Sequence, residues 1–443
     1  MKKTIRNCIA ALSAFSLLIT MSACGSKTDS NTSSGSKNSN TVFTDDPYSD
    51  IPSSLKGSTV KMVVWYEMPE EEKAVLDAFT AKTGIKVEVT ETAGTTAYTE
   101  KIVSLMSSNM APDIIAFNSD TNFPGWTSSV LQPLDKNIFR LDDKIWDKSV
   151  MDALKVGDNY YGVNIAGSFT NDSMYVLYYN DTLLKNYGIK TPRSYYEQGN
   201  WNWDTLNEVL AKIKSGINGV VPISFFKTFP VMWSAGTDFV SYDGNKMSSN
   251  LTDTKIVDAY SMMSDWLHKG YYIDNGYAAN ELSNGKSAML CGITYGMKSN
   301  NGWWSENKGL GTGTLDAVPF PSPKGSETTV PTDCKLWGTA KGSANSEGAA
   351  YCLRYFLDPA NYDMDSLFLN ANLKKTFEDI QKMPKQINYS QGVISYVDAQ
   401  SYNVLNFQLI TADSSQVNVA LDSYSNIVTK AVSRVNSNVF GAE

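Results

Sequence analysis

The stretch TVKMVVWYEMPEEEKAVLDAFTAKTGIKVEV, residues 59–89, decides the fold. It starts with Thr59–Trp65, a valine-rich run typical of a strand, and Pro69 followed by three glutamates is typical of a helix start. Thr83-Gly84 ends that helix, and apolar residues then alternate with polar ones over 85–89, as in a half-buried strand. A strand, a helix and a second strand in this order predict a βαβ unit, and with it an α/β fold.

The alternation of strands and helices continues downstream. A helical pattern over 102–106 leads through Pro112 to the apolar run Asp113–Phe117, which suits a buried parallel strand. Sheets of this kind bind ligands at the carboxyl ends of their strands. The residues just past the first and third strands, Trp65-Tyr66-Glu67 and Asn118-Ser119-Asp120, are therefore expected to face one crevice.

The end of the chain and its only histidine both belong to helical patterns. Ser401–Asn436 carries the apolar stripe of a helical segment, and a second helical pattern, Ile256–Leu267, runs up to His268. A histidine in the last turn of a helix lies favourably against the helix dipole, so we expect His268 to be a solvated terminal residue and not a catalytic base. With one histidine and scattered cysteines, the sequence has no zinc-ligand spacing, and we expect no metal site.

The beginning of the chain predicts export. Basic residues within the first six positions precede Cys8–Ile19, a mostly apolar run too short to span a bilayer permanently. The following segment, Met21–Gly25, resembles the lipobox of bacterial lipoproteins, with Met21 in place of the more usual leucine. This resemblance implies a signal peptide over residues 1–23 and a lipid on Cys24.

A tether follows the predicted lipidation site. Gly25–Asn40 contains no apolar side chain and cannot form a packed core, so we expect residues 24–55 to consist of the lipidated cysteine and a flexible linker. Two or more acyl chains hold a protein stably at a membrane. We therefore expect the protein to be anchored by lipid on the outer face of the cell membrane.

Charge and motif counts exclude several other classes. Among 443 residues, 38 are basic and 46 acidic, for a net charge of −8, whereas a nucleic-acid binder needs a basic surface. Gly285-Lys286-Ser287 resembles the end of a phosphate-binding loop, but Asn280 stands where that motif needs glycine. We therefore predict no nucleic-acid partner and no nucleotide or other cofactor. The three remaining cysteines, Cys291, Cys334 and Cys352, are expected to fill the core.

Several segments together resemble family 1 of the extracellular solute-binding proteins of ABC importers, the group that includes maltose-binding protein. Their order and spacing carry the resemblance from about residue 58 onward. The matching pieces are Val64-Trp65 before an acidic helix, Ala111–Ile115, Leu134-Asp135, Tyr161-Gly162-Val163, Tyr178-Tyr179-Asn180, Gly188–Pro192, Trp203-Asp204, Asn284–Met289 and Ser343–Leu357.

The resemblance implies an α/β fold with two lobes, a periplasmic-binding-protein-like clamp that closes by hinge motion at chain crossovers. We expect the crossovers near residues 163–171, 316–319 and 370–380. The first lobe is then expected to comprise 56–165 plus 317–375, and the second lobe 166–316 plus 376–443.

The family also implies the chemistry of the site. A sugar presents hydroxyls at its rim and C–H patches on its faces, so its binder needs aromatic platforms together with carboxylates and amides. Tyr295 and Trp337 fall where the family places ligand residues. The full set of expected ligand-binding residues is Trp65, Tyr66, Glu67, Asn118, Asp120, Tyr161, Asn164, Trp233, Asp238, Tyr295, Trp303 and Trp337.

The function implied is non-catalytic: a monomeric lipoprotein captures a carbohydrate, expected to be an oligosaccharide, and delivers it to a membrane permease with its ATPase. A surface glycoside hydrolase remains an alternative, because two suitably spaced carboxylates suffice for that chemistry. A binding protein for a non-sugar solute such as a polyol or peptide, and an adhesion lipoprotein without a small ligand, are the other readings of the sequence.

Overall fold

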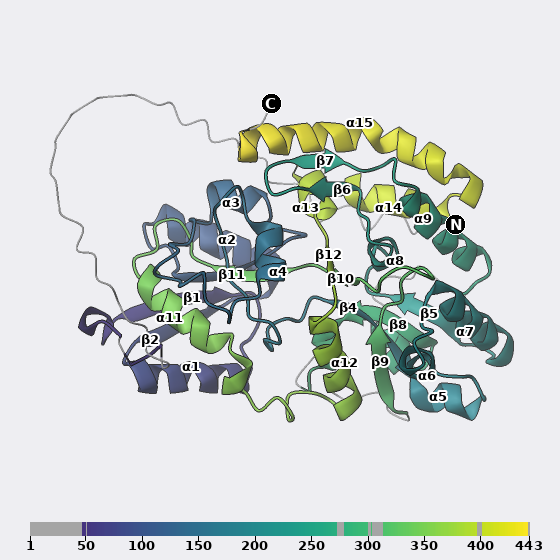
Figure 1. Ribbon diagram of the computed structural model, residues 1–443, viewed down its shortest axis with the longest axis horizontal. Coiled ribbons are helices and arrows are strands. Elements are labelled where there is room, and N and C mark those ends of the chain that lie inside the picture. The colour runs from purple at the N-terminus through teal and green to yellow at the C-terminus, as the bar shows by residue number, and fades with distance from the viewer. Residues whose placement is uncertain are drawn as a thin grey trace. The chain divides into compact units, whose positions relative to one another are not determined.

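The computed structural model of the chain (Figure 1) describes residues 47–49, 51–272, 279–299, 303, 313–396 and 401–441. Residues 48–443 form one compact unit, which contains two four-stranded sheets. The predicted signal peptide, Cys24 and most of the predicted linker lie outside the described residues.

The first sheet has the strand order β11-β3-β1-β2. Its strands are β1 (Thr59–Val64), β2 (Lys86–Glu91), β3 (Ile114–Asn118) and β11 (Lys335–Gly338). β1 pairs in parallel with β2 and β3, while β11 runs antiparallel to β3. The βαβ unit predicted from residues 59–89 is therefore confirmed, with α1 (Glu70–Thr83) between its strands and Gly84, at φ 74°, ending the helix.

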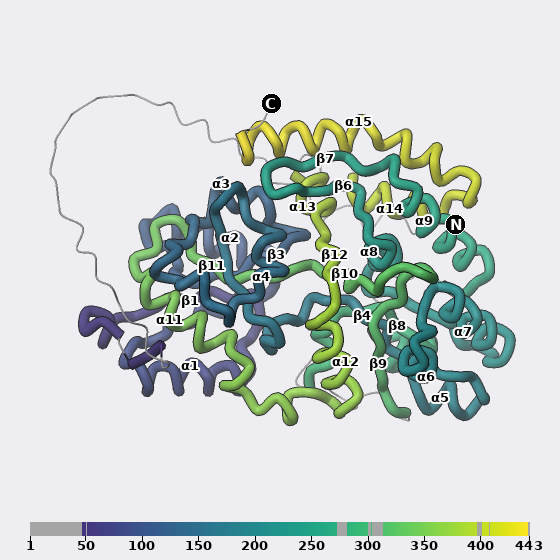
Figure 2. Tube along the Cα trace, viewed as in Figure 1, coloured from purple at the N-terminus to yellow at the C-terminus, as the bar shows by residue number. Residues whose placement is uncertain are grey.

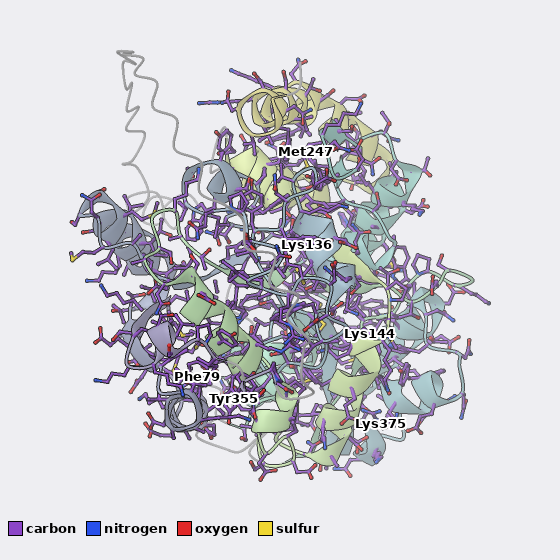
Figure 3. The ribbon with its side chains drawn as sticks, turned by 60° about the vertical axis from the view of Figure 1, so that its left-hand side comes forward. Phe79, Lys136, Lys144, Met247, Tyr355 and Lys375 are labelled. Atoms are coloured by element: carbon purple, nitrogen blue, oxygen red, sulfur yellow. The ribbon has the colours of Figure 1, made fainter. Side chains whose placement is uncertain are left out.

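The helices packed with this sheet form the first lobe. They are α1, α2 (Gly94–Ser107), α3 (Gly125–Ser129), α4 (Lys148–Met151) and α11 (Ser346–Phe356), with short 3₁₀ turns at Ser53–Leu55 and Asp152–Leu154. α11 packs beside α1, and Figure 3 shows Phe79 and Tyr355 close together, with ring centroids 5.8 Å apart. A segment 276 positions downstream, counted from Phe79 to Tyr355, thus completes the core begun by the first helix.

The second sheet has the order β5-β8-β4-β9. Its strands are β4 (Tyr175–Asn180), β5 (Val221–Phe225), β8 (Ser287–Ile293) and β9 (Leu315–Pro319), with β5 and β8 parallel and β4 antiparallel to both of its neighbours. The helices of this part are α5 (Asp181–Asn186), α6 (Pro192–Glu197), α7 (Trp203–Gly216), α8 (Pro230–Ser234), α10 (Ala279–Ser283) and α12 (Ala371–Gln381). The Asn202 side chain caps α7 by accepting from the Asp204 and Thr205 N–H groups, which fixes the start of that helix.

A further group of elements packs together near the C-terminus. It comprises the hairpin β6 (Val240–Tyr242) and β7 (Met247–Ser249), together with α9 (Thr254–His268), α13 (Ser390–Ser395), α14 (Ser401–Thr411) and α15 (Val417–Val435), which continues as a π-helical turn at Asn436–Phe440. Figure 1 shows α15 as the long yellow helix beside this hairpin. The predicted helical character of the chain end is confirmed. In the described residues, no helix combines the length and the apolar character needed to cross a bilayer.

The chain passes between the two sheets at neighbouring places. β10 (Val330–Thr332) pairs in parallel with β12 (Lys385–Ile387), and Met174, just before β4, forms an antiparallel bridge with Thr332. Figure 2 shows β10 and β12 side by side between the two sheets. The first crossover lies between Val163, which bridges to Trp337 in the first sheet, and Met174.

The other two crossovers differ from the prediction. Residues 316–319 are not a crossover but part of β9, whose residues are all buried and pair with β4, so the chain leaves the second sheet only after Pro319. Likewise α12 contacts β9, which puts 371–375 with the second sheet and the third crossover between Phe356 and Ala371. The predicted boundaries at 317 and 375 are corrected accordingly.

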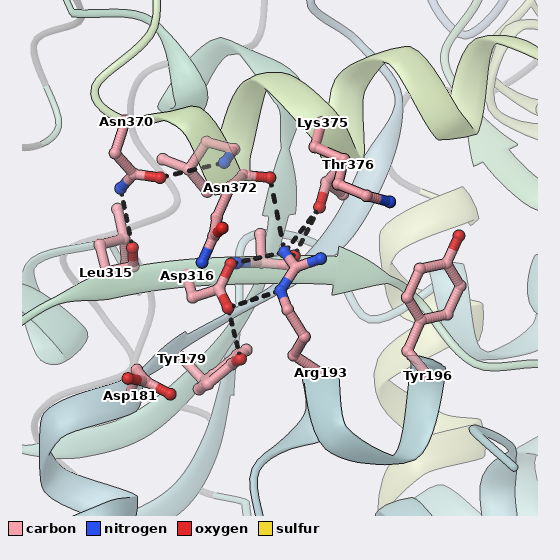
Figure 4. Close-up of polar contacts among 12 residues, drawn as sticks. Tyr179, Asp181, Arg193, Tyr196, Leu315, Asp316, Asn370, Asn372, Lys375 and Thr376 are labelled. Carbon is pink, nitrogen blue, oxygen red and sulfur yellow. Dashed lines mark hydrogen bonds and ion pairs between the residues drawn. The ribbon is translucent and has the colours of Figure 1, made fainter. Parts of the chain in front are cut away.

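A buried ion pair explains where α12 belongs. Arg193 of α6 donates through Nε and Nη2 to the two carboxylate oxygens of Asp316 in β9, at 2.8 and 2.6 Å, and Nη2 also donates to Thr376 Oγ1 of α12 at 2.9 Å (Figure 4). Tyr179 of β4 donates to the same carboxylate at 2.6 Å. One guanidinium therefore ties the returning helix to the sheet that the chain had left earlier.

The expected positions of the cysteines in the core and of His268 at a solvated helix end are confirmed. Cys291, Cys334 and Cys352 are buried free thiols, and burial raises the pKa of each. His268 ends α9 with its side chain 56% exposed, and its Nε2 lies 3.4 Å from Asp413. None of the three thiols has the exposure that a reactive cysteine needs.

Candidate functional site

The strand ends of the two sheets carry the candidate site. Trp65 and Tyr66 follow β1, Asp120 follows β3, Lys227 follows β5 and Tyr295 follows β8. Lys227 Nζ donates to Asp120 Oδ2 at 3.0 Å, so the end of a strand in the second sheet meets the end of a strand in the first. Carboxyl strand ends, where α/β sheets generally bind ligands, therefore meet here from both sheets.

Lys227 is the centre of the first polar cluster. Besides Asp120, its ammonium donates to Asp333 Oδ2 at 2.8 Å and to Gln391 Oε1 at 3.2 Å. Burial raises the pKa of Asp120, the carboxylate of Asp333 raises it further, and Lys227 offsets part of the rise. Burial alone would lower the pKa of Lys227, but the two carboxylates outweigh burial and hold it above its ordinary value. The cation is therefore fixed and already paired.

A second cluster surrounds Asp172 in the first crossover. Its carboxylate lies 3.0 Å from Lys298 Nζ and 2.5 Å from Lys335 Nζ. Lys298 follows the 3₁₀ turn Thr294–Met297 after β8, and Lys335 begins β11 of the first sheet. Burial would raise the pKa of Asp172, but the two ammonium groups outweigh it and hold the pKa at about 2. Lys335 Nζ also lies 5.1 Å from the Trp65 ring centroid, so this cluster reaches the aromatic side chains of the first sheet.

Tyr66 and Glu72 form a third contact beside this cluster. The Tyr66 hydroxyl donates to Glu72 Oε2 at 2.7 Å, and burial raises the pKa of Glu72. The Tyr66 hydroxyl is therefore occupied by the chain itself, while its ring, which is only partly buried, packs edge-on against Trp65 with centroids 5.7 Å apart.

Aromatic rings line both sides of these clusters. Trp65 meets Tyr98 edge-on at 5.4 Å in the first lobe, and Trp303 packs against Tyr295 at 5.9 Å and Phe226 at 5.3 Å in the second. Trp65, Tyr295 and Trp303 are all partly exposed. Trp65 and Tyr295 each lie beside one of the two lysines that hold Asp172, and aromatic rings beside paired charges suit a ligand with apolar faces and polar edges.

Two glycines make room for the Trp303 ring. A Cβ added at Gly292 or Gly296 would lie 2.9 or 2.8 Å from atoms of that ring, closer than ordinary packing allows. The Trp303 indole therefore occupies its place only because the residues at the end of β8 and in the turn after it are glycines without a side chain.

Five of the predicted ligand residues are linked by these contacts: Trp65, Tyr66, Asp120, Tyr295 and Trp303. Two more lie at the same strand ends. Glu67 is exposed, and Asn118 has a buried Oδ1 that no hydrogen-bond donor among the described residues reaches. Asn118 Oδ1 is therefore an acceptor without a donor at the end of β3, and the hydroxyl of a bound ligand could donate to it after a small rearrangement.

Five other predicted residues are placed in the core or in structural contacts. Trp233 and Trp337 are 0% exposed; Trp233 stacks on Phe229 at 5.6 Å and Trp337 meets Phe356 at 5.4 Å. Neither indole offers a face to a ligand in this conformation, because each is packed within the hydrophobic core. Tyr161 is also buried, and its carbonyl oxygen lies 2.1 Å from the place where a Cβ on Gly338 would be.

Asp238 and Asn164 have their polar atoms used by the chain. The Asp238 carboxylate accepts from the Trp233 indole and from the backbone N–H groups of Phe239, Tyr389 and Ser390, which fills about four acceptor positions. Burial raises the pKa of Asp238 to about 6, and these hydrogen bonds limit the rise. The Asn164 amide donates to Asn171 Oδ1 and to the Lys335 carbonyl, so it holds the first crossover instead of facing a ligand.

The sequence analysis missed the three lysines of the site and Asp172. Lys227 was detectable in principle, because Phe226-Lys227 follows the run Val221–Phe225 as Trp65-Tyr66 follows β1. Asp172, Lys298 and Lys335 carry no local signal, since they meet only when the crossover and both sheets are in place. Among the described residues, no group of three His, Cys, Asp or Glu side chains is placed to hold a metal ion.

Solved structures with the same fold are numerous. The chain is similar to a cyclic α-maltosyl-1,6-maltose binding protein from Arthrobacter globiformis, with 13% identity and a TM-score of 0.64, covering 85% of this chain and 100% of that one. It is also similar to the sugar-binding protein MalE from Xanthomonas citri, with 16% identity and a TM-score of 0.65, covering 84% and 98%. A third is an extracellular solute-binding protein from Staphylococcus aureus in complex with maltose, with 15% identity, a TM-score of 0.61 and coverage of 85% and 98%.

These similarities establish the fold, a two-lobed α/β clamp of the periplasmic-binding-protein type, as the resemblance predicted. No curated protein matches the chain in sequence. The sequence profile described as bacterial extracellular solute-binding protein matches residues 74–367, which is more than half of the chain. By this match the chain belongs to the bacterial extracellular solute-binding protein family.

Proposed function

We propose that the protein captures a neutral carbohydrate between its two lobes, without altering it, and delivers it to an ABC importer. The observation that carries the proposal is the presence of aromatic rings beside the ion-paired clusters in both lobes. Trp65 comes from the first lobe, and Tyr295 and Trp303 come from the second. The structures similar to this chain include proteins whose names or bound ligands are maltose and related glucosides, which supports the sugar class.

The electrostatics favour a neutral ligand. Among the described residues of the site, the ammonium groups of Lys227, Lys298 and Lys335 each already lie within 3.0 Å of a carboxylate. An anionic ligand would have to displace one of these partners and leave a buried carboxylate uncompensated, which is costly. A hydroxylated ligand needs no such exchange.

The ion-paired aspartates of the candidate site support binding without catalysis. Hydrolysis of a glycosidic bond needs one carboxylic acid and one free carboxylate, whereas Asp120, Asp172 and Asp333 are each held by lysine. No release of reducing sugar from any ligand that binds would be the expected result; release at a steady rate would contradict the proposal.

The free energy of ligand binding at such a site must come from several contacts. A micromolar ligand needs about −8 kcal/mol, while one hydrogen bond contributes about 0.5–1.5 kcal/mol. Stacked rings must supply a substantial share, which predicts that removing them weakens binding more than removing single polar groups does.

The test uses the exported chain with Cys24→Ala, so that no lipid is attached, and a panel of maltose, maltotetraose, xylobiose, xylotetraose and mannitol. A binding sugar at 100 times its Kd should stabilise the protein by about 2.7 kcal/mol in a thermal or denaturant titration. Trp65→Ala and Trp303→Ala should each weaken binding at least about tenfold, given what aromatic contacts contribute at buried sites.

The matched control is Tyr187→Ala, because Tyr187 is 53% exposed at the end of α5. It should bind the sugar as the parent protein does. A parent protein that responds to no saccharide, or tryptophan variants that bind as tightly as the control, would refute the proposed site.

We further propose that Cys24 carries a lipid that anchors a monomer to the outer face of the membrane, where the permease and its ATPase receive the ligand. The lipobox-like segment Met21–Gly25 and the polar stretch Gly25–Asn40 support this. Partition of the expressed protein into the detergent phase, lost in Cys24→Ala, is the expected result, and equal partition of both proteins would contradict it.

A further inference from the structure

A small hollow of about 20 Å³ lies where the chain passes between the two sheets. Its lining comes from the start of α4, the first crossover, the residues around β10, the end of α12 and the start of β12. Figure 2 shows β10 and β12 side by side in this region. A space of about 10–15 Å³ suffices for one water molecule, whereas an organic ligand needs far more. We call this space the hinge hollow.

Two opposite charges line the hinge hollow. Asp147 stands before the first turn of α4, and Lys385 is the first residue of β12. Burial lowers the pKa of Lys385, and the Asp147 carboxylate offsets part of that effect, so the two charges act on each other. They form no direct ion pair; Lys385 Nζ donates instead to the carbonyl oxygens of Ile380, Gln381 and Met383. Polar groups that interact without touching are commonly bridged by water.

The Asp147 carboxylate has an acceptor to spare. Its Oδ1 accepts from the N–H and the hydroxyl of Ser149, which caps α4. Among the described residues, no donor reaches its Oδ2. The Asp147 N–H donates to the Asn164 carbonyl at 2.9 Å, which holds the residue against the first crossover. A carboxylate fixed in place thus keeps one oxygen for a donor that the chain does not supply.

Gln381 offers a donor in the same lining. Its Oε1 accepts from the Gly167 N–H at 3.2 Å and from Asn171 Nδ2 at 3.3 Å, which fixes the orientation of the amide. Its Nε2 contacts Met174 Sδ at 3.8 Å, and a thioether is a weak acceptor. One amide N–H therefore remains for a better acceptor. A water molecule accepts and donates at once, and needs two to four polar partners.

The charges of the lining disfavour an ion in the hinge hollow. A metal cation would lie beside the ammonium groups of Lys335 and Lys385, and an anion would lie beside the Asp147 carboxylate. Like charges at such short range repel each other. A neutral molecule that donates on one side and accepts on the other meets neither repulsion.

We propose that the hinge hollow binds one ordered water molecule, which donates to Asp147 Oδ2 and accepts from Gln381 Nε2. Asp147 lies before the first crossover, and Gln381 lies after the third. The water therefore links chain segments far apart in sequence at the place where the two sheets are connected. This role is the same whichever solute the protein captures.

The first test is a crystal structure of the Cys24→Ala protein at a resolution that shows ordered water. Electron density for one water should lie about 2.5–3.2 Å from an Asp147 carboxylate oxygen and from the Gln381 amide nitrogen. A hollow without this density, or a direct contact between Asp147 and Lys385, would overturn the inference.

The second test uses the sign of a stability change. Val150 lines the hinge hollow and is 7% exposed, so Val150→Ile adds a methylene group there. If the methylene displaces a bound water, Asp147 and Gln381 each lose a hydrogen-bond partner, and the urea midpoint of unfolding should fall. In a dry hollow the same methylene would gain packing contacts, and the midpoint would rise.

Val103→Ile is the matched control, because it makes the same substitution at a side chain that is 50% exposed on α2. Its urea midpoint should equal that of the parent. The crystal structure of Val150→Ile should show the isoleucine in the place of the water, which separates displacement from strain elsewhere. A raised midpoint in Val150→Ile, or one unchanged as in the control, would refute the bound water.

Discussion

At the scale of single residues, the carboxylates near the site differ in what they are able to do. Asp238 is saturated by four N–H donors and fastens the start of α13, whereas Asp172 has two lysines as its partners. Burial raises the pKa of Asp238 to about 6, while the lysines hold that of Asp172 at about 2. The same residue type is thus a helix anchor in one place and a counter-ion in the other, because its neighbours differ.

The pKa of Asp172 leads to a prediction about pH. A carboxyl whose pKa is lowered on folding stabilises the protein above its unfolded value near 3.8, and this stabilisation is lost as the pH falls toward about 2. Asp172→Asn should therefore lower the free energy of unfolding by about 2 kcal/mol at neutral pH. Denaturant titrations from pH 7 to pH 3 should show that difference shrinking below about pH 4.

Asp142→Asn is the matched control, because the Asp142 carboxylate is 79% exposed beside Lys136. This substitution should change the free energy of unfolding little at any pH, because exposed ion pairs contribute little to stability. A difference for Asp172→Asn that stayed constant down to pH 3 would show that the two lysines do not act on this carboxylate.

At the scale of elements, the second sheet and its helices are held together by segments far apart in sequence. Arg193 of α6 binds both Asp316 of β9 and Thr376 of α12 (Figure 4). The helix after the third crossover is therefore fixed to a strand that lies before the second crossover. The Arg193 side chain is 11% exposed and that of Asp316 3%. Removing one partner of such a pair leaves the other charge buried and uncompensated.

Arg193→Met should lower the free energy of unfolding by about 3–5 kcal/mol, the range for breaking a buried pair. Because the loss comes from the stranded carboxylate, the double variant Arg193→Met/Asp316→Leu should regain part of it. Denaturant unfolding of both proteins measures the effect. Lys375→Met, on the exposed side of α12, is the control and should change stability by less than about 1 kcal/mol. A loss no larger than that of the control would refute the anchoring role.

At the scale of the whole unit, Lys227 connects the sheets. It extends from the end of β5 to Asp120 at the end of β3 and to Asp333 after β10. These charge pairs join strand ends of opposite sheets and therefore oppose separation of the two sheets. The first crossover, which contains Asp172, is held in the same way by lysines from both sides.

Lys227→Met leaves two carboxylates facing each other and should shift the ligand-free protein toward an open form. Small-angle X-ray scattering should then give a larger radius of gyration than for the parent, and sugar affinity should fall, because a smaller fraction of the protein is competent to bind.

For this experiment, Lys136→Met removes an exposed lysine paired only with Asp142 and should change neither quantity. An unchanged radius together with unchanged affinity in Lys227→Met would show that the contact with Asp120 does not govern closure.

The sequence by itself determined the local elements and where ligands could lie. The alternation over residues 59–89 was enough for β1, α1 and β2, because side-chain period and helix-ending glycine are local properties. The residues after β1 and β3 followed from the direction of parallel strands, and the resemblance supplied the two-lobed arrangement. The burial of the three cysteines followed from composition alone.

Only the tertiary structure decided which aromatic side chains lie at the candidate site and which fill the core. Trp65 and Trp337 both lie in or next to strands of the first sheet, yet one is partly exposed and the other 0% exposed, because α11 covers Trp337. Lys227 and Asp120, 107 positions apart, meet only through the placement of two sheets. Such contacts depend on strand order and on the positions of the crossovers, and no local pattern of side chains encodes either.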